Sequence, residues 1–326
     1  MSDLKVRPPK EKGTGEARYT SGPMATITAL DVNWVDHPHS IGAALVESEG
    51  HRSLVDPGPT STLPTLRMRL AERGLSVADL DAILLTHIHL DHGGASGSLV
   101  QEKPSLPVYV HKNGAPHMAD PSKLIASASR LWGEQLEYLF GTMVPVPQDN
   151  LRILEGGETL EFGARKIEVV YTPGHASHHV SYFDQLDGVA FVGDTTGVRI
   201  DDGPYTLPAT PPPDIDLGLW DQSFREITAR KPKQLFLTHY GFVTDPGAHV
   251  AVFRERLHRW MDETERILRA STNDEEALQH FLAYAHADIA KFLPPDEMEH
   301  YAFTAGLDLS FAGLARHSRK RAAKSA

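Results

Sequence analysis

The sequence predicts an α+β fold in which short buried strands alternate with helices, followed by a helical C-terminal region. Apolar runs of strand length recur until about residue 240, and Gly or Pro follows many of them. Beyond Gly247 the apolar residues keep a helical spacing instead. We therefore divide the 326 residues into a leader at 1–23, a main domain at 24–249 and a helical appendage at 250–326.

The elements before residue 86 follow from local composition. Residues 1–23 are polar with little periodicity, which predicts a flexible leader. Alternating apolar residues then predict strands, and a helical spacing ended by Gly74 predicts the first helix. The predicted ranges are 26–32, 42–47 and 53–55 for the strands and 63–73 for the helix.

The apolar run 80–85 predicts a buried strand, and the next seven residues read Thr-His-Ile-His-Leu-Asp-His. Side chains alternate along an extended segment, so His87 and His89 should point the same way. A turn at Leu90 would bring Asp91 and His92 in from another direction. Three imidazoles and a carboxylate suit a borderline-soft divalent ion, Zn²⁺ first, with Mn²⁺ and Fe²⁺ as alternatives.

Further metal-competent residues follow later strands. Strands predicted at 166–171, 188–192 and 234–237 run into His175, Asp194 and His239, respectively. Upstream, the strand at 53–55 runs into Asp56 in the same way. A strand at 108–110 and a helix at 219–229 continue the alternation between these segments. The recurrence after separate strands distinguishes this pattern from a His-rich surface turn.

These segments together resemble the metallo-β-lactamase superfamily of hydrolases, across about residues 25–250. The resemblance implies an αββα sandwich, in which helices flank two mixed β-sheets and the metal ions lie at one sheet edge. It implies that one ion is held by His87, His89 and His175. The second ion is held by Asp91, His92 and His239, with Asp194 bridging the pair and Asp56 orienting a ligand histidine.

The resemblance also implies the reaction. A hydroxide shared between two divalent ions would cleave a small ester, thioester or lactone, and Asp91 would accept the proton. Tyr240 is a candidate hydrogen-bond donor to the developing oxyanion, with packing beside His239 as an equal alternative. Asp194 stands where true zinc β-lactamases of the commonest type carry a cysteine, which favours the glyoxalase II-like and lactonase-like branches.

Other substrates remain open from the sequence. The lactonase branch usually has a Tyr three residues after the bridging Asp, where this chain has Gly197. Relatives suggest two alternatives on the same ligands: a phosphodiesterase or nuclease, and a mononuclear-iron persulfide dioxygenase. The net charge of −11, from 43 acidic and 32 basic residues, disfavours nucleic acid as a partner and leaves a small molecule.

Composition bounds the remaining properties. The chain has no cysteine, which excludes disulfides and thiolate ligands. No apolar run is long enough to span a bilayer, and the start lacks a hydrophobic signal core, so we expect a cytoplasmic protein with no membrane partner.

Two segments are candidates for the walls of a substrate pocket. An amphipathic helix is predicted within 121–140, and the Pro-rich segment 204–213 would form the opposite rim. Packing on the core is an equally good explanation of their apolar residues. The candidate pocket residues are Met118, Trp132, Tyr138 and Tyr205.

The C-terminal region is predicted to be wholly helical. One long amphipathic helix covers 249–269, and Asn273 followed by acidic residues predicts the start of another. These helices could pack against the cleft or form a homodimer interface. The basic residues near the end of the chain are read as a solvated tail.

Overall fold

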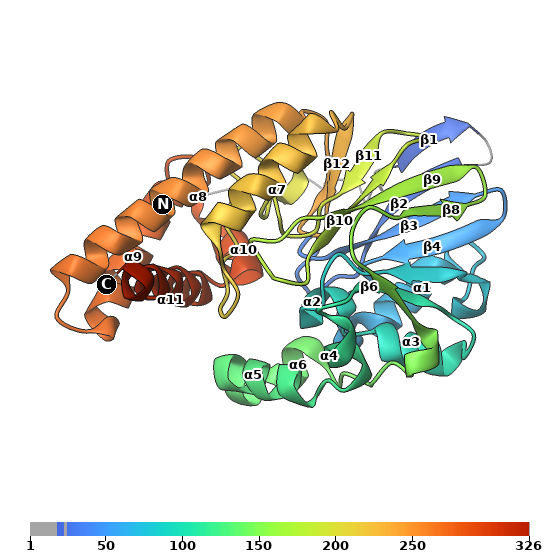
Figure 1. Ribbon diagram of the computed structural model, residues 1–326, viewed down its shortest axis with the longest axis horizontal. Coiled ribbons are helices and arrows are strands. Elements are labelled where there is room, and N and C mark those ends of the chain that lie inside the picture. The colour runs from blue at the N-terminus through green and yellow to red at the C-terminus, as the bar shows by residue number, and fades with distance from the viewer. Residues whose placement is uncertain (1–17, 23–24, 326) are drawn as a thin grey trace, which may run out of the picture.

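Two mixed β-sheets lie face to face in the computed structural model, which describes residues 18–22 and 25–325 (Figure 1). The first sheet has the strand order β1-β2-β3-β4-β5-β6-β7 and the second β13-β12-β11-β10-β9-β8. Neighbours pair antiparallel except β4–β5, β5–β6, β6–β7 and β11–β12, which are parallel. The predicted αββα sandwich of two mixed sheets is confirmed.

The strands are short, as the alternating apolar runs predict. Those of the first sheet are β1 (Arg18–Gly22), β2 (Ala25–Asp31), β3 (Gly42–Ser48), β4 (His51–Val55), β5 (Ala82–Leu84), β6 (Val108–His111) and β7 (Leu151–Leu154). Those of the second sheet are β8 (Thr159–Phe162), β9 (Arg165–Tyr171), β10 (Val180–Asp184), β11 (Val189–Phe191), β12 (Gln234–Leu237) and β13 (Gly241–Val243).

Alternate residues of one strand enter different layers of the core. In β2, Ile27 and Ala29 face the second sheet, whereas Leu30 belongs to the cluster under the helices on the other side. In β5, Leu84 lies between the sheets and Ile83 lies under those helices. Both faces of these strands are therefore buried, which explains their continuous apolar sequence.

Helices cover the outer face of each sheet (Figure 1). Against the first sheet lie α1 (Leu63–Ala71), α2 (Leu90–Gly93), α3 (Ser96–Glu102), α4 (Ala115–Ala119), α5 (Ser122–Trp132) and α6 (Leu136–Phe140). Against the second lie α7 (Leu217–Ala229) and α8 (Pro246–Ala270), on which α9 (Asp274–Ile289), α10 (Pro295–Ala305) and α11 (Leu307–Ser325) pack. Short 3₁₀ turns are η1 (Thr60–Thr62), η2 (Val77–Asp79), η3 (Gly133–Gln135), η4 (Gln148–Asn150) and η5 (Ile200–Asp202).

Three boundaries differ from the sequence prediction. Residues 18–22 of the expected leader form strand β1, which pairs antiparallel with β2; the remainder of that leader, residues 1–17 and 23, lies outside the described residues. The helix expected within 121–140 is broken at Gly133, whose φ of +54° is outside the helical range. Helix α8 begins at Pro246, capped by the Asp245 carboxylate, a few residues before the predicted appendage.

The C-terminal helices share one core with the second sheet. Phe224 of α7, Phe253 of α8 and Phe281 of α9 are buried in the same apolar cluster as Leu235 of β12. Asn273 caps α9 through its side chain, as predicted. Within the described part of the chain, none of the helices combines the length and apolar character that a membrane crossing requires.

Candidate metal centre

The histidine-rich segment leaves the first sheet directly after β5. His87 and His89 follow in extended backbone, and α2 then turns the chain so that Asp91 and His92 approach from one side. His175 follows β9, Asp194 follows β11 and His239 follows β12. Strand ends from both sheets therefore deliver these side chains to one edge of the sandwich.

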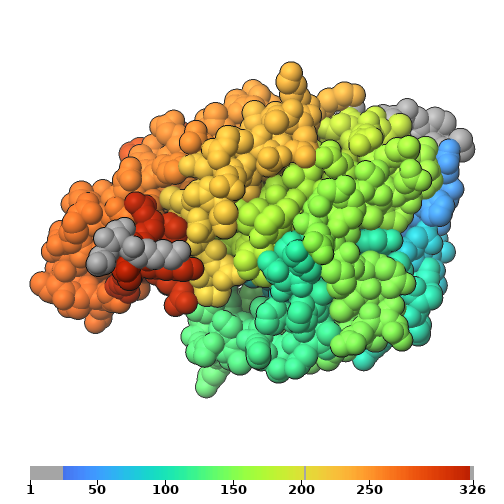
Figure 2. Space-filling view, viewed as in Figure 1, coloured from blue at the N-terminus to red at the C-terminus, as the bar shows by residue number. Residues whose placement is uncertain are grey.

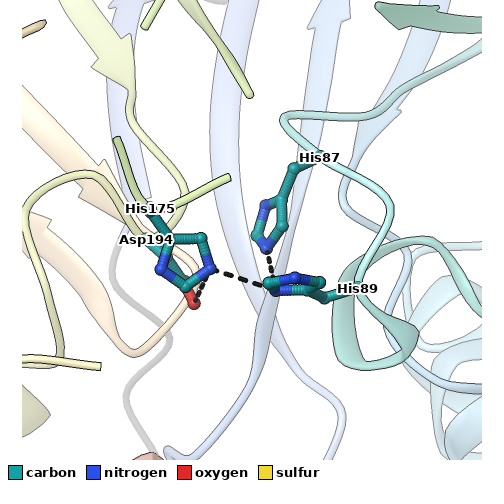
Figure 3. A group of neighbouring side chains, drawn as sticks. All are labelled: His87, His89, His175 and Asp194. Atoms are coloured by element: carbon teal, nitrogen blue, oxygen red, sulfur yellow. Dashed lines mark hydrogen bonds and ion pairs between the residues drawn. The ribbon is translucent and has the colours of Figure 1, made fainter. Parts of the chain in front are cut away.

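The first group consists of His87, His89, His175 and Asp194 (Figure 3). The Nδ1 atom of His89 lies 3.0 Å from His87 Nε2 and 3.0 Å from His175 Nε2. His175 Nε2 lies 3.4 Å from Asp194 Oδ2. Four donor atoms within 4.8 Å of one another, three of them imidazole nitrogens, could hold one divalent ion.

The second group consists of Asp91, His92 and His239. His239 Nε2 lies 3.3 Å from Asp91 Oδ2, and His92 Nε2 lies 3.7 Å from the same oxygen. Asp194 also reaches this group, because its Oδ1 lies 3.2 Å from His92 Nε2 and 3.6 Å from His239 Nε2. The two oxygens of Asp194 thus face different groups.

Two enclosed atoms at this point suit a cation between them. His92 Nε2 and Asp194 Oδ1 lie 3.2 Å apart, and among the described residues neither has a hydrogen-bond partner of good geometry. An orphaned buried nitrogen and carboxylate oxygen are costly unless something coordinates them. The donor set is imidazole and carboxylate, which suits zinc, manganese or iron.

Hydrogen bonds to the far side of His175 and His239 fix which nitrogen of these two rings faces the centre. Ala209 O lies 3.0 Å from His175 Nδ1, and Ser40 O lies 2.6 Å from His239 Nδ1. A carbonyl can only accept, so Nδ1 carries the proton and Nε2 is free to bind a cation. This is the usual arrangement behind a histidine ligand.

Asp56 orients His92 from a fully buried position. Its carboxylate accepts hydrogen bonds from His92 Nδ1 (2.9 Å), Thr86 N (2.8 Å), Thr86 Oγ1 (2.7 Å) and Thr238 Oγ1 (2.9 Å). His92 lies on α2, whereas Thr86 follows β5 and Thr238 follows β12, strands that belong to different sheets. The carboxylate therefore also ties the two halves of the centre together.

Burial keeps part of the centre neutral. It lowers the pKa of His87 well below the usual value, and the neighbouring His92 adds to the effect. Burial likewise lowers the pKa of His89 to about 4, with His175 reinforcing it. A neutral imidazole is the form that binds a metal ion.

The carboxylates have the opposite effect on the second group. Burial alone would lower the pKa of His92, but Asp194, Asp91 and Asp56 together raise it well above its usual value. Burial opposes ionisation of Asp194, yet His92, His239 and His175 outweigh it and hold the pKa of Asp194 well below the usual range. The negative charge that favours a proton here favours a metal cation equally.

A cavity of about 310 Å³ opens onto both groups, which contribute His89, Asp91, Asp194 and His239 to its lining. This volume lies at the small end of the range for small-molecule sites. Trp132, one of the predicted pocket residues, lines the cavity. The predicted rim at 204–213 contributes Ala209 and the prolines that follow Thr210.

The other three predicted pocket residues do not line the cavity. Met118 is fully buried in the core under the first sheet, and Tyr138 is 68% exposed on the outer side of α6. Tyr205 turns towards the C-terminal helices, where its hydroxyl donates to Asp288 at 2.8 Å. Side chains of a rim segment can face either the cavity or the C-terminal helices. The sequence alone does not indicate which of these Tyr205 faces.

Tyr240 is not among the cavity-lining residues either. Its ring stacks on His39, with ring centroids 4.5 Å apart, and packs closely over Gly42. The structure therefore gives the expected oxyanion role no geometric support and favours the packing explanation.

Two further buried histidines, His178 and His179, lie beside the centre. His178 lines the cavity, and its Nδ1 has no partner among the described residues. His179 lies behind the centre, with Nδ1 3.0 Å from Thr172 Oγ1. Their signal in the sequence is the short interval after His175, which keeps them on the same loop as a ligand.

Comparisons with known proteins show which proteins this chain is similar to. The chain is 32% identical over 169 residues to the metallo-beta-lactamase fold-containing protein ST1585 of Sulfurisphaera tokodaii, covering 51% of this chain and 62% of that protein. It is 30% identical over 173 residues to a hydroxyacylglutathione hydrolase of Aeromonas hydrophila, covering 53% of this chain and 50% of the relative. The chain thus spans half to less than two thirds of the length of these curated relatives.

Solved structures show the same fold at low identity. The crystal structure of ST1585 from Sulfolobus tokodaii superposes with a TM-score of 0.64 at 22% identity, covering 88% of this chain and 97% of that one. TTHA1429 from Thermus thermophilus also gives a TM-score of 0.64, at 20% identity, covering 95% of this chain and 94% of that one. The sequence model of the metallo-beta-lactamase superfamily matches residues 39–240 of this chain, and this range includes every candidate ligand. The chain therefore belongs to the metallo-β-lactamase superfamily.

Proposed function

We propose that this protein is a dinuclear metal-dependent hydrolase that cleaves a small ester, thioester or lactone. The observation that carries the proposal is the shared carboxylate of Asp194, whose two oxygens face two separate groups of histidine and aspartate donors. A single-ion site would not need the second group, which holds Asp91, His92 and His239. Relatives named hydroxyacylglutathione hydrolase support a hydrolytic reaction.

Two divalent cations in such a site supply an activated water as nucleophile and polarise the carbonyl that it attacks. The chain's own residues position and neutralise the centre. His87, His89 and His175 stay neutral through burial and offer nitrogen donors, while Asp194 and Asp91 contribute negative charge. His92 is held in place by Asp56.

Asp91 is the best candidate to handle protons during turnover. It is the most exposed of the candidate acidic ligands, with 22% of its side chain accessible against 6% for Asp194. It lines the cavity, so a substrate can reach it. We propose that it accepts the proton of the attacking water and passes it to the leaving group.

The cavity favours a neutral carbonyl compound over nucleic acid. It is a confined space of about 310 Å³ rather than an extended basic groove, and the chain carries a net charge of −11. The lining beyond the ligands is largely apolar, with Leu131, Trp132 and Phe140 on one side.

The test is hydrolysis of p-nitrophenyl esters, lactones, thioesters and bis-p-nitrophenyl phosphate before and after chelation. We expect ester, thioester or lactone turnover that chelation abolishes and added Zn²⁺ or Mn²⁺ restores. Preference for the phosphodiester would replace the proposal by a phosphodiesterase. Oxygen uptake with a persulfide by an iron-loaded protein would replace it by a dioxygenase.

Asp91→Asn tests the proton-handling role. We expect kcat to fall by about 10²- to 10⁴-fold, because the amide cannot accept the proton. Asp262→Asn is the matched control, because Asp262 is exposed on α8 and does not line the cavity. Full activity of an Asp91→Asn variant that retains its metal would remove Asp91 from the mechanism.

A further inference from the structure

We infer that the cavity beside the metal centre binds a linear acyl chain of medium length, held between α5 and the helices α10 and α11. This inference rests on the proposed function and names its substrate class. It implies that substrate selectivity depends on protein segments around the metal centre rather than on the candidate metal ligands. The hollow between the segment near residue 130 and the C-terminal helices is visible in Figure 2.

One wall of the cavity is a rigid aromatic surface. Trp34, Trp132 and Phe140 line it, and the ring centroid of Phe140 lies 5.6 Å from that of Trp34 and 5.4 Å from that of Trp132. Trp34 Nε1 donates to Leu139 O at 2.6 Å, which satisfies the polar atom of the indole. The Trp34 indole therefore has no unpaired polar atom, and the aromatic wall can make apolar contacts with a ligand.

Helix α5 contributes a second apolar surface to the cavity wall. Leu124, Ala128 and Leu131 line it and repeat at the spacing of one helix face. Leu131 remains 38% exposed and Leu124 is half-buried, whereas Ala128 is buried, so the outer part of this face is only partly covered within the protein. An apolar ligand would cover it.

The C-terminal helices close the opposite side. Ala305 at the end of α10 and Leu309 of α11 line the same cavity as the ligands His89 and His239. An acyl chain that lies between these helices and α5 would therefore have one end at the metal centre. A molecule with its reactive carbonyl at one end of an apolar part would satisfy both surroundings.

His178 supplies an unsatisfied polar group at the metal end. Its ring is about nine-tenths buried, lines the cavity and packs 5.6 Å from the ring of His89, centroid to centroid. Its enclosed Nδ1 has no hydrogen-bond partner within the described residues. That enclosed nitrogen is closed to the cavity, so a ligand would meet the remaining edge of the imidazole.

The cavity volume sets the length of the chain. About 310 Å³ lies at the small end of the range for small-molecule sites. A site of this size suits an acyl chain of medium length rather than a very long one. Longer chains must extend into solvent and gain nothing further.

The test measures kcat/KM for p-nitrophenyl esters from acetate to palmitate. We expect an increase of about two- to fourfold per methylene up to about eight carbons, followed by a plateau or fall. A flat or decreasing series from acetate onward would overturn the inference while leaving hydrolysis intact. Absence of hydrolysis with every ester would instead count against the proposed function.

Binding can be followed without turnover. Trp34 and Trp132 line the cavity, so octanoate added to the metal-depleted protein should change the tryptophan fluorescence in a saturable way, whereas acetate should not. An identical response to both acids would contradict an acyl-chain site. Saturation by octanoate in a protein that hydrolyses nothing would retain the site and reject the proposed reaction.

Two variants on α5 locate the chain. Leu131→Ser should lower kcat/KM for the octanoate ester about tenfold and for the acetate ester less than about twofold. Leu186→Ser is the matched control, because Leu186 is similarly exposed at 40% but does not line the cavity. Ala128→Leu should move the optimum to shorter esters by filling space. An unchanged optimum in Ala128→Leu would place the chain elsewhere and overturn the inference.

Discussion

At the scale of single residues, the centre depends on carboxylates that are held by their surroundings. Asp56 is buried and receives four hydrogen bonds, including one from His92 Nδ1. It does not line the cavity, so its contribution must act through the histidine it holds. Such outer partners raise the basicity of a ligand imidazole and fix its orientation.

Asp56→Asn should therefore weaken metal binding without removing a ligand. The amide keeps the shape but replaces one acceptor oxygen with a donor, which opposes the donors that surround it. We expect the affinity for Zn²⁺ to fall about 10- to 100-fold, measured by competition with a chromogenic chelator. Unchanged affinity in a folded variant would show that His92 does not need this carboxylate.

The candidate ligands were predictable because each follows an apolar strand closely. His175, Asp194 and His239 lie far apart in sequence, yet strand ends from one sheet edge meet in space. Tyr205 and Tyr240 could not be placed in this way, since their direction depends on packing against the C-terminal helices and Gly42, respectively. The short interval after His175 puts His178 on the same loop, but its burial in the cavity wall could not be predicted, because burial cannot be read from a loop sequence.

At the scale of elements, α11 supports the segment that orients His175. Thr210 Oγ1 donates to Ser310 O at 3.1 Å, and the neighbouring Ala209 supplies the carbonyl at 3.0 Å from His175 Nδ1. Gly313 lets the helix approach this closely, because a Cβ at that position would lie 1.9 Å from Thr210 O. Helix α11 and the candidate ligand His175 are thus coupled through one loop.

Gly313→Ala should separate α11 from that loop. We expect the free energy of unfolding to fall by about 1–3 kcal/mol, measured by urea denaturation, as for other overpacked sites. Gly247→Ala is the control, because no atom lies within 4 Å of the added Cβ and the helix gains a better helix former. Equal stability of Gly313→Ala and the parent would mean that α11 can shift freely.

Periodicity predicted most elements but not their interruptions. The alternation of apolar residues predicts the bounds of β2, β3 and β9 to within a residue or two. It does so because alternate side chains of each strand enter different layers of the core. The break at Gly133 follows from a positive φ in open surroundings, which the apolar pattern of 121–140 does not encode. The pairing of β1 with β2 depends on the sheet edge rather than on composition.

At the scale of the whole molecule, a buried charge network joins the C-terminal helices to the cavity rim. Asp288 of α9 accepts hydrogen bonds from Tyr205 OH at 2.8 Å and Arg259 Nη2 at 2.9 Å. Arg256 lies 3.6 Å from the same carboxylate and stacks on the Tyr205 ring at 3.8 Å. We propose that these helices are an integral part of the catalytic unit.

Asp288→Asn should leave Arg256 buried beside a neutral group. We expect a loss of about 3–5 kcal/mol in the free energy of unfolding at neutral pH, measured by urea denaturation. Glu255→Gln is the control, because Glu255 is 78% exposed and approaches Arg259 only at 3.9 Å. A loss no larger than that of the control would show that the network is dispensable.

The same network has a definite pH dependence. Burial raises the pKa of Asp288, but Tyr205, Trp260 and the two arginines outweigh it, so the folded-state pKa lies below the usual value. Stability from this carboxylate is therefore complete above a pH of about 4 and is lost as the pH falls through the lower folded-state pKa. The difference between Asp288→Asn and the parent should shrink as the pH falls below about 4.

The central claim is that two groups of donors, joined by Asp194, hold two cations in one chain. Metal quantification on the purified, cation-saturated protein tests it most directly. We expect two divalent ions per chain, and a reduced content in His239→Ala, which removes a candidate ligand of the second group only. One ion per chain, unchanged in His239→Ala, would contradict the claim and leave the second group without a role.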